Sequence, residues 1–419
     1  MKDILCAKRA GAARHLSLAL AALTFVILAA NFSAAQVNAV YLNGNIGTVS
    51  NGNVVYGYSN DGAGNLTPLP GSPYLTAGTG SAPAPGTALG LQTDDDQQVI
   101  INNAGTLLFT VNGFSNTIAV FDINSDGSLT MIPGSPSTSG GTQPASLGLF
   151  DGALGNGVGF LVAVNKSSDP TQTNPKKPNF QTFTVASDGT LTHNTGSQVT
   201  LTTGASPSQA AIALQHLFFG MQFAGGSPPP PVPSTIFSYR IRSNGTLNLI
   251  SSVTTPNPGS LFLGEVVHPT KAILYAALPA DSQIGVYSYA PGTGLMTFQT
   301  TVANPGQLPC WLAINAAGTR LYSGESMSNS ITVYDLTNAL LPVQLQHITL
   351  TFTITGSGVT NLRFDPTGQF LYAISNETAE SSLHVFNVAS DGTLSETITP
   401  TVIPVPFGNY PIGLATVMK

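Results

Sequence analysis

The sequence predicts an all-β protein, a seven-bladed β-propeller built from four-stranded antiparallel blades. Three observations lead to this prediction. A short turn motif centred on Asp-Gly or Asn-Gly recurs along the chain, strand-like segments of two kinds precede the copies, and successive copies lie 46 to 63 residues apart without a helical pattern between them. The clearest copies are two identical VASDGTL heptapeptides, at residues 185–191 and 388–394. Looser copies lie at residues 59–69, 123–132, 241–250 and 290–298.

The turn motif predicts one hairpin in each unit. Asp-Gly and Asn-Gly between β-forming residues are a strong hairpin signal, because glycine accepts a positive φ without steric cost. The sixth unit is the weakest, since DLTNALLPVQL replaces the Asp-Gly turn, and the fourth carries the insertion AGGSPPPPVPS. Seven units can be placed by their turn residues, which are Gly64, Gly127, Gly189, Gly245, Gly292, Asn338 and Gly392.

Two kinds of strand precede each turn. The nearer one alternates apolar and polar residues, as in NTIAVFDI, TIFSYRI and SLHVFNV, which predicts a half-buried strand. The farther one, as in TLLFTVN, GFLVAVN and QFLYAIS, is more continuously apolar and predicts a strand buried on both faces. A first strand, often led in by proline, and a last strand after the turn bring each unit to four strands, the content of a propeller blade.

The two ends of the repeat region predict how the ring closes. The first unit starts at AVYLNGN, which reads as a second strand, and no Pro-led first strand precedes it. The last residues, NYPIGLATVMK, read as a Pro-led first strand with no unit after them. We therefore expect the C-terminal strand to complete the first blade and close the ring, which removes exposed strand edges.

Residues 1–35 read as a secretory signal peptide. Basic residues precede the apolar run LSLALAALTFVILAA, and the small residues Ser-Ala-Ala follow it. We expect cleavage before Gln36, which leaves residues 36–419 as the propeller, in the periplasm or secreted from the cell. The alternative is a single membrane anchor, for which the apolar run is short.

Charge and composition argue against several classes of partner. The chain has 13 Lys+Arg and 19 Asp+Glu, and without residues 1–35 it has 9 and 18, a net charge of −9. Such a surface argues against nucleic acid and anionic membranes as partners, and weakly against a phosphorylated substrate, which would need a basic cluster. After cleavage we expect a monomer with no membrane attachment, no cofactor and no metal.

The two cysteines, Cys6 and Cys310, predict no disulfide in the mature chain. Cys6 leaves with the signal peptide, and it precedes the apolar run, so it is not a lipid-attachment site. Cys310 is expected to be a small buried apolar residue.

Several longer motifs make the sequence similar to a known family. The turns continue as GNLTPLPGSP at residues 64–73 and DGSLTMIPGSP at 126–136, and RLYSGESMSNSITVYDL and FDPTGQFLYAIS occur at 320–336 and 364–375. Over about residues 37–419 the sequence resembles the lactonase family of seven-bladed β-propellers, which includes propeller-type 6-phosphogluconolactonases and carboxymuconate-lactonizing enzymes. The match is strongest to its secreted bacterial branch. The resemblance implies the propeller fold and lactonase chemistry, although fold by itself does not imply function.

The resemblance also implies which residues would act. The family's enzymes use Arg, His and Glu side chains around the central funnel to bind a lactone and open or close it. The family's Pro-Arg-His start of a first strand corresponds to LPCWLAIN, where Cys310 and Trp311 stand instead. Its Asn-Glu at the end of a second strand corresponds to Glu325, one position early, and to Asn376-Glu377 in a longer loop. The family's catalytic set is therefore incomplete in this chain.

Glu325 and Glu377 are the candidates for acid/base catalysis. Both follow a predicted buried strand, where loops reach one face of the propeller. A carboxylate there could activate water for attack on a lactone carbonyl if burial tuned its pKa. For each residue the alternative is a solvated loop glutamate.

Arg363 is the candidate substrate-binding residue. It lies within NLRFDP, in the first strand of the seventh unit, and first strands line the central channel of a propeller. A guanidinium there would bind a carboxylate or stabilise an oxyanion. The alternative is an arginine at the edge of the core, paired with Asp365 or with another blade.

Two other clusters of side chains suggest sites less directly. His268, in EVVHPTK, lies near Glu265, a pairing suited to a general base, but its position in the turn between first and second strands favours a structural role. Asp94, Asp95 and Asp96 could bind calcium, which takes several oxygen ligands, but they lack the alternating spacing of a calcium loop. A solvated acidic loop is the alternative.

Two functions remain open at this point. One is a secreted lactonase-like propeller that hydrolyses a small cyclic ester at the funnel, with Glu325, Glu377 and Arg363 as its site. The other is a non-catalytic propeller that binds a carbohydrate, a peptide or an envelope protein. The features that discriminate between them are whether Glu325 and Arg363 meet in one pocket, and whether that pocket is lined by acidic residues or bare.

Overall fold

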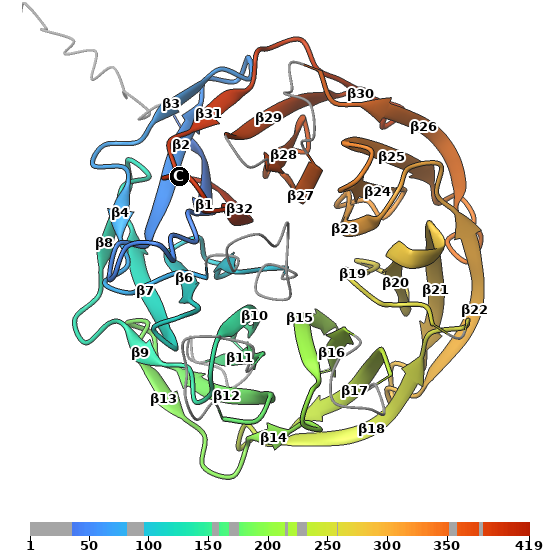
Figure 1. Cartoon of the computed structure of the whole chain (residues 1–419), viewed down its shortest axis with the longest axis horizontal. Helices are drawn as coiled ribbons and strands as arrows, with labels where there is room; N and C mark the ends of the chain where they lie inside the picture. The colour runs from blue at the N-terminus through green and yellow to red at the C-terminus, as the bar shows by residue number, and fades with distance from the viewer. Residues whose placement is uncertain are drawn as a thin grey trace, which may run out of the picture. The chain divides into compact units, whose positions relative to one another are not determined.

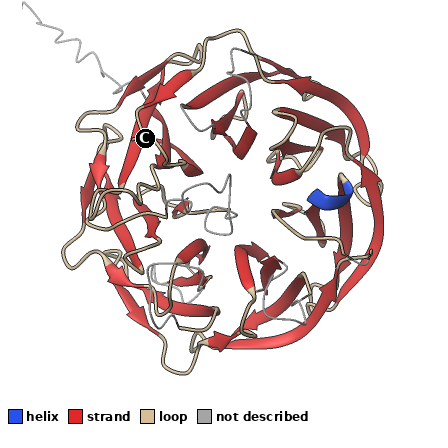
Figure 2. Cartoon of the chain, viewed as in Figure 1, coloured by secondary structure: helices blue, strands red, loops and turns tan. Residues whose placement is uncertain are grey.

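A computed structural model provides the structure of the chain. It describes residues 36–81, 96–152, 159–166, 176–213, 217–223, 233–257, 259–351, 358–376 and 380–419. Val37–Lys419 forms one compact unit, which holds all the strands in the described part of the chain. Apart from one short 3-10 helix, η2 (Pro279–Asp281), the regular structure of the described residues is β-strand, as Figure 2 shows. None of the described helices is long and apolar enough to cross a membrane.

Seven antiparallel sheets, counted over the described residues, form the blades of a ring (Figure 1). Blade one contains β32 (Ile412–Met418), β1 (Asn38–Asn43), β2 (Val54–Asn60) and β3 (Leu66–Pro68), with β4 (Tyr74–Leu75) beside β2. Blade two contains β5 (Val99–Ile101), β6 (Leu107–Asn112), β7 (Thr117–Ile123) and β8 (Leu129–Met131), with β9 (Ser137–Thr138) beside β7. Blade three contains β10 (Pro144–Phe150), β11 (Gly159–Asn165), β12 (Asn179–Val185) and β13 (Leu191–His193), with β14 (Val199–Thr200) beside β12.

The remaining four blades follow the same order from the channel outward. Blade four contains β15 (Ser206–Ala213), β16 (Leu217–Phe223), β17 (Thr235–Ile241) and β18 (Leu247–Thr254). Blade five contains β19 (Glu265–Val267), β20 (Ile273–Leu278), β21 (Gln283–Tyr289) and β22 (Met296–Ala303). Blade six contains β23 (Pro309–Ile314), β24 (Arg320–Glu325), β25 (Ser330–Asp335) and β26 (Val343–Thr349). Blade seven contains β27 (Gly358–Phe364), β28 (Phe370–Asn376), β29 (Ser381–Val388) and β30 (Leu394–Ser395), with β31 (Thr401–Ile403) beside β29.

The C-terminal strand closes the ring as predicted. β32 pairs antiparallel with β1, and the backbones of Val37 and Lys419 exchange two hydrogen bonds, of 2.8 and 2.9 Å. The first strands of successive blades contact one another in the order β32, β5, β10, β15, β19, β23, β27 and back to β32. These seven strands therefore form the wall of a central channel.

The prediction about the second strands is also confirmed. Every described residue of β6, β11, β20 and β28 is buried, because these strands lie in the middle of a blade with a neighbouring blade on each side. The apolar core lies between the blades. One cluster, for example, joins Tyr322 and Val333 of blade six to Leu371 and Phe386 of blade seven.

In several blades the recurring turn glycine is hydrogen-bonded to the blade before it. Its carbonyl oxygen accepts a hydrogen bond from the preceding blade: Tyr41 Oη donates to Gly127 (2.6 Å) and Ser238 Oγ donates to Gly294 (2.7 Å). Gly294 has φ = 86°, so it, and not the predicted Gly292, is the turn residue of blade five. The repeated motif thus specifies a contact between blades as well as a hairpin.

Candidate active site in the central channel

The first strands enclose a cavity of about 180 Å³ in the channel. Its wall comes from β15, β19, β23, β27 and β32, and from the two residues Asp96 and Gln97 that lead into β5. Six of the seven blades therefore contribute to it. A site of this kind can be assembled only when the ring is closed.

Arg363 lies in this cavity, which agrees with the prediction that it faces the channel. It is carried by β27, where it pairs with Tyr372 of β28, and its side chain is exposed to the channel although protein surrounds it. Burial lowers the pKa of the Arg363 guanidinium, and the nearby charge of Asp96 raises it in the opposite direction. The cavity thus contains a cation and an anion whose charges interact.

Asp96 is held in place from two sides. Its Oδ1 accepts a hydrogen bond from the backbone N–H of Gln97 (2.7 Å) and another from Asn361 Nδ2 (3.0 Å). Gln97 has φ = 60°, in the left-handed region that non-glycine residues rarely occupy, and it belongs to the cavity wall. A strained backbone conformation of this kind persists only where contacts around it hold it in place. Here the hydrogen bond from Asn361 of blade seven to Asp96 holds the segment that leads into blade two.

A chain of amides continues from Asp96 across the channel. Gln209 Nε2 donates to Gln97 Oε1 (3.0 Å) and to the backbone oxygen of Glu265 (2.7 Å), and the N–H of Glu265 donates back to Gln209 Oε1 (2.5 Å). Blades two, four, five and seven are joined by this network. It positions the side chains of the cavity by hydrogen bonds between first strands, which local sequence patterns do not encode.

Glu265 is the most unusual residue of the cavity. It is 1% exposed, and neither carboxyl oxygen has a hydrogen-bond partner among the described residues. Burial raises the pKa of Glu265 well above its usual range, and the charge of Asp96 raises it further. The dipole of the Ala211 N–H lowers this pKa, but its geometry does not reach that of a hydrogen bond. Glu265 therefore holds its proton at pH values where an exposed glutamate has lost it.

Together these groups supply three chemical functions in one enclosed space. Arg363 provides a positive charge for a developing oxyanion, protonated Glu265 provides an acid, and Asp96 provides a carboxylate that can accept a proton. A carboxyl group whose pKa is raised by burial is a recurring component of acid/base catalysis.

Glu325 is placed elsewhere. It ends β24, a second strand, and it is not among the residues that line the cavity around Arg363. Its carboxylate is fully buried and accepts hydrogen bonds from Asn304 Nδ2 and Ser330 Oγ, each 2.9 Å long. Burial raises the pKa of Glu325 to about 7, and the hydrogen bonds from Asn304 and Ser330 oppose that rise. Among the described residues Glu325 does not line the cavity that contains Arg363, and it is not a solvated loop residue.

Some predicted site residues lie outside the described residues. Glu377 is one of them, and so are Asp94 and Asp95, so their catalytic and calcium-binding roles stay predictions. Asp96 is described and belongs to the channel cavity. Within the described ranges there is no cluster of three or more His, Cys, Asp or Glu side chains arranged to hold a metal ion.

His268 and Cys310 are structural residues. His268 Nδ1 accepts hydrogen bonds from the backbone N–H groups of Thr270 (3.2 Å) and Lys271 (3.1 Å), which fixes the turn after β19. Cys310 and Trp311, which stand at the position of the family's Arg-His, are each 2% exposed and pack with Leu263 in an apolar cluster. They support the wall of the channel and do not offer polar groups to the cavity.

The sequence places Arg363 on a strand that lines the channel, but it does not place Glu265 in the same cavity. Glu265 was seen, but it was paired with His268, three positions further along the chain. The feature that places both residues at the channel is that each lies in the first strand of a blade. Glu265 begins β19, and Arg363 lies near the end of β27. That feature becomes usable once the strand boundaries are known.

Comparison with known proteins supports the architecture. No protein-family model matches the sequence, and no curated protein matches it. A protein of Lactobacillus plantarum has a similar structure, with a TM-score of 0.68 and 15% identity over 91% of this chain and 99% of that chain. The periplasmic gluconolactonase PpgL of Pseudomonas aeruginosa gives 0.66 and 15% identity over 91% of this chain and 99% of that chain. A Bacteroides fragilis protein proposed to be a 6-phosphogluconolactonase gives 0.64 and 15% identity over 91% and 98%. At these identities the likeness concerns the fold, and the chain has the seven-bladed architecture of the 6-phosphogluconolactonase-like propellers.

Proposed function

We propose that the protein is a lactonase-type hydrolase that opens a small cyclic ester in the central channel. The observation that carries this proposal is the position of Glu265, a buried carboxyl group without a hydrogen-bond partner among the described residues, in the same cavity as Arg363 and Asp96. A buried polar group without a partner is costly, so it is expected where a ligand supplies the missing contact. The names of the gluconolactonase neighbours agree with this reaction class.

The proposed reaction uses each group once. Asp96 accepts a proton from water as its oxygen attacks the lactone carbonyl carbon, and Arg363 stabilises the negative charge that develops on the carbonyl oxygen. The ring C–O bond then breaks, and Glu265 donates its proton to the leaving oxygen, which gives the open hydroxy acid. Proton transfer from Asp96 to Glu265 through solvent restores the starting state.

The composition of the cavity also agrees with the alternative function. The side chains of Gln97, Gln209 and Asn361 are amides, which suit the hydroxyl groups of a carbohydrate, and the Arg-His of the related enzymes is replaced by buried Cys310 and Trp311. A propeller that binds a sugar-like ligand without opening it would use the same cavity. The two functions differ in their need for Glu265 and Asp96. Hydrolysis requires a proton donor and a proton acceptor, whereas binding alone requires neither.

The test is hydrolysis of a panel of sugar and aliphatic lactones by the purified protein and its variants. We expect turnover above the uncatalysed rate, reduced by about 100-fold or more in Glu265→Gln and in Arg363→Gln. Glu325→Gln is the matched control, since it changes another buried glutamate outside the cavity. Turnover that survives both cavity variants but is lost in Glu325→Gln would place the chemistry on the second-strand loops. The absence of turnover, with lactone or sugar binding that depends on Arg363, would support the binding propeller.

We also propose that the protein acts outside the cytoplasm. The signal-peptide pattern of residues 1–35 supports export, and one structural neighbour is described as periplasmic. Detection of the N-terminus at Gln36 in protein recovered from the periplasm or the medium would support this. An intact N-terminus in the membrane fraction would favour the anchor.

A further inference from the structure

Ser382, His384 and Glu396 form a hydrogen-bonded relay in blade seven. His384 Nε2 lies 3.0 Å from Ser382 Oγ, and His384 Nδ1 lies 2.5 Å from Glu396 Oε1. In serine hydrolases the histidine contacts the nucleophile through Nε2 and the orienting acid through Nδ1, so the same ring atoms face the same partners here. None of the three residues lines the channel cavity.

The fold fixes the relay through three strands. Ser382 and His384 are two positions apart on β29, so their side chains point to the same face of the blade. Glu396 follows β30, and its second carboxylate oxygen accepts hydrogen bonds from the backbone N–H (2.9 Å) and the hydroxyl (2.5 Å) of Thr351, just after β26. Both oxygens of Glu396 are thus held, which fixes the orientation of the imidazole.

His384 and Glu396 are more deeply buried than Ser382. A nucleophilic serine must be accessible to its substrate, whereas its histidine and acid can be buried. The side chains of His384 and Glu396 are 0% and 1% exposed, whereas Ser382 is half-buried. Removal of water strengthens the interactions between histidine and glutamate. The alternative is that these residues only join blades six and seven. The contact between Glu396 and Thr351 would be enough for that role, and it would not require the partly exposed hydroxyl of Ser382 beside His384.

We propose that Ser382 is an activated serine that is acylated by small, activated carboxylic esters, at a site separate from the channel. Its Oγ attacks the carbonyl carbon as its proton passes to His384 Nε2. The bond to the leaving alcohol then breaks, and the alcohol takes the proton from Nε2. Water adds to the acyl carbon in the same way, which releases the carboxylic acid and restores the hydroxyl. Glu396 is a positioning residue that holds the tautomer and stabilises the imidazolium.

The test is covalent labelling of the purified protein with a fluorophosphonate, followed by peptide mapping, and release of 4-nitrophenol from 4-nitrophenyl acetate. We expect one adduct on Ser382, no adduct there in Ser382→Ala, and labelling about 100-fold slower in His384→Gln. Ser381→Ala is the matched control, because Ser381 is the buried neighbour on the opposite face of the strand.

Two results would overturn the proposal. One is the absence of an adduct on Ser382 in protein whose thermal unfolding shows that it is folded. The other is labelling of Ser382 at an unchanged rate in folded His384→Gln, which would show that the histidine does not activate it. Ser382→Ala leaves the pair of His384 and Glu396 intact, so the experiment remains decisive if His384→Gln does not fold.

Discussion

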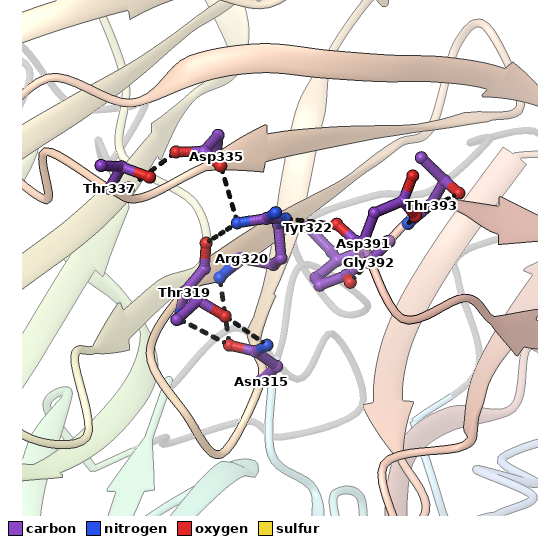
Figure 3. Close-up of polar contacts among 9 residues, drawn as sticks. All are labelled: Asn315, Thr319, Arg320, Tyr322, Asp335, Thr337, Asp391, Gly392 and Thr393. Atoms are coloured by element: carbon purple, nitrogen blue, oxygen red, sulfur yellow. Dashed lines mark hydrogen bonds and ion pairs between the residues drawn. The ribbon is translucent and has the colours of Figure 1, made fainter.

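The hydroxyl of Tyr322 in blade six donates a 2.7 Å hydrogen bond to the carbonyl oxygen of Gly392, in the turn of blade seven (Figure 3). Tyrosines at the same position of other second strands do the same, as Tyr275 does with Ala339 in the turn of blade six (2.8 Å). This contact explains why the turn motif recurs at such long intervals. Each of these turns forms a hairpin in its own blade and presents a buried carbonyl oxygen to the blade before it.

Loss of the Tyr322 hydroxyl should destabilise the propeller. In Tyr322→Phe the carbonyl of Gly392 loses its side-chain donor in a buried place, which should lower the free energy of unfolding by about 1–3 kcal/mol. Tyr287→Phe is the control, because the Tyr287 hydroxyl is buried without a hydrogen-bond partner among the described residues. Urea unfolding of both variants gives the comparison. Equal destabilisation by the two changes would show that the contact with Gly392 contributes nothing specific.

Gly392 should tolerate substitution less well than Gly368, another turn glycine with a positive φ. It has φ = 89°, and a Cβ built on it would lie 2.5 Å from Cγ of Arg320, a side chain held by Asp335 (2.7 Å) and by the carbonyl of Asp391 (2.6 Å) (Figure 3). Gly392→Ala therefore adds a clash to the cost of the left-handed backbone. Gly368→Ala is the control, because its φ is 73° and a Cβ there meets nothing within 4 Å.

We expect the alanine variant at Gly392 to unfold at a lower temperature than the one at Gly368. The backbone cost, about 1–2 kcal/mol, is common to both variants. Thermal unfolding of the two variants measures the difference in their stability, which comes from the clash of the added methyl group with Arg320. Similar unfolding temperatures would mean that Arg320 moves aside without loss.

Buried Glu325 should make stability depend on pH. Its pKa is about 7 in the folded protein, above the ordinary value of 4.5, so the folded state binds the proton more tightly than the unfolded state does. The stability that its protonated form provides is complete below about pH 4.5 and is lost as pH rises to about 7. One pKa unit corresponds to about 1.4 kcal/mol, so ionised Glu325 costs roughly 3 kcal/mol.

Glu325→Gln isolates this effect. The amide stays neutral, so the fall in stability between pH 4.5 and 7 should become shallower in the variant, as urea unfolding at several pH values would show. Glu265 contributes a slope of the same sign, which is why the difference between wild type and variant is the quantity to measure. Parallel slopes would show that Glu325 is ionised throughout this range.

The sequence predicted the parts of the fold that repeat and missed the parts that do not. The turns, the two kinds of strand and the closing strand follow from patterns a few residues long, and each recurs often enough to be recognised. The turn of blade five shows the limit. APGTG contains two glycines, and the local sequence does not indicate that Gly294, whose carbonyl accepts a hydrogen bond from Ser238, is the one with the positive φ.

The channel cavity could not be predicted in the same way. Asn361 donates to Asp96, which is 265 positions away, and Gln209 reaches Gln97 over 112 positions. These contacts depend on which residues of each first strand point toward the channel axis. Successive side chains of a strand point to opposite sides, so an error of one residue in the predicted strand places the wrong side chains in the channel. Arg363 could be placed at the channel because NLRFDP reads as a first strand, and first strands line the channel.

The proposed reaction predicts a pH dependence that differs from that of stability. Glu265 acts in its protonated form, so lactone hydrolysis should fall as pH rises through the pKa of Glu265, which burial and the charge of Asp96 raise. Initial rates between pH 5 and 10, corrected for the spontaneous opening of the lactone, would show this limb. Glu325→Gln should keep it, because that residue lies outside the cavity. Glu265→Gln should lose it together with most of the rate, whereas a variant that retained the same alkaline limb would show that another group supplies the proton.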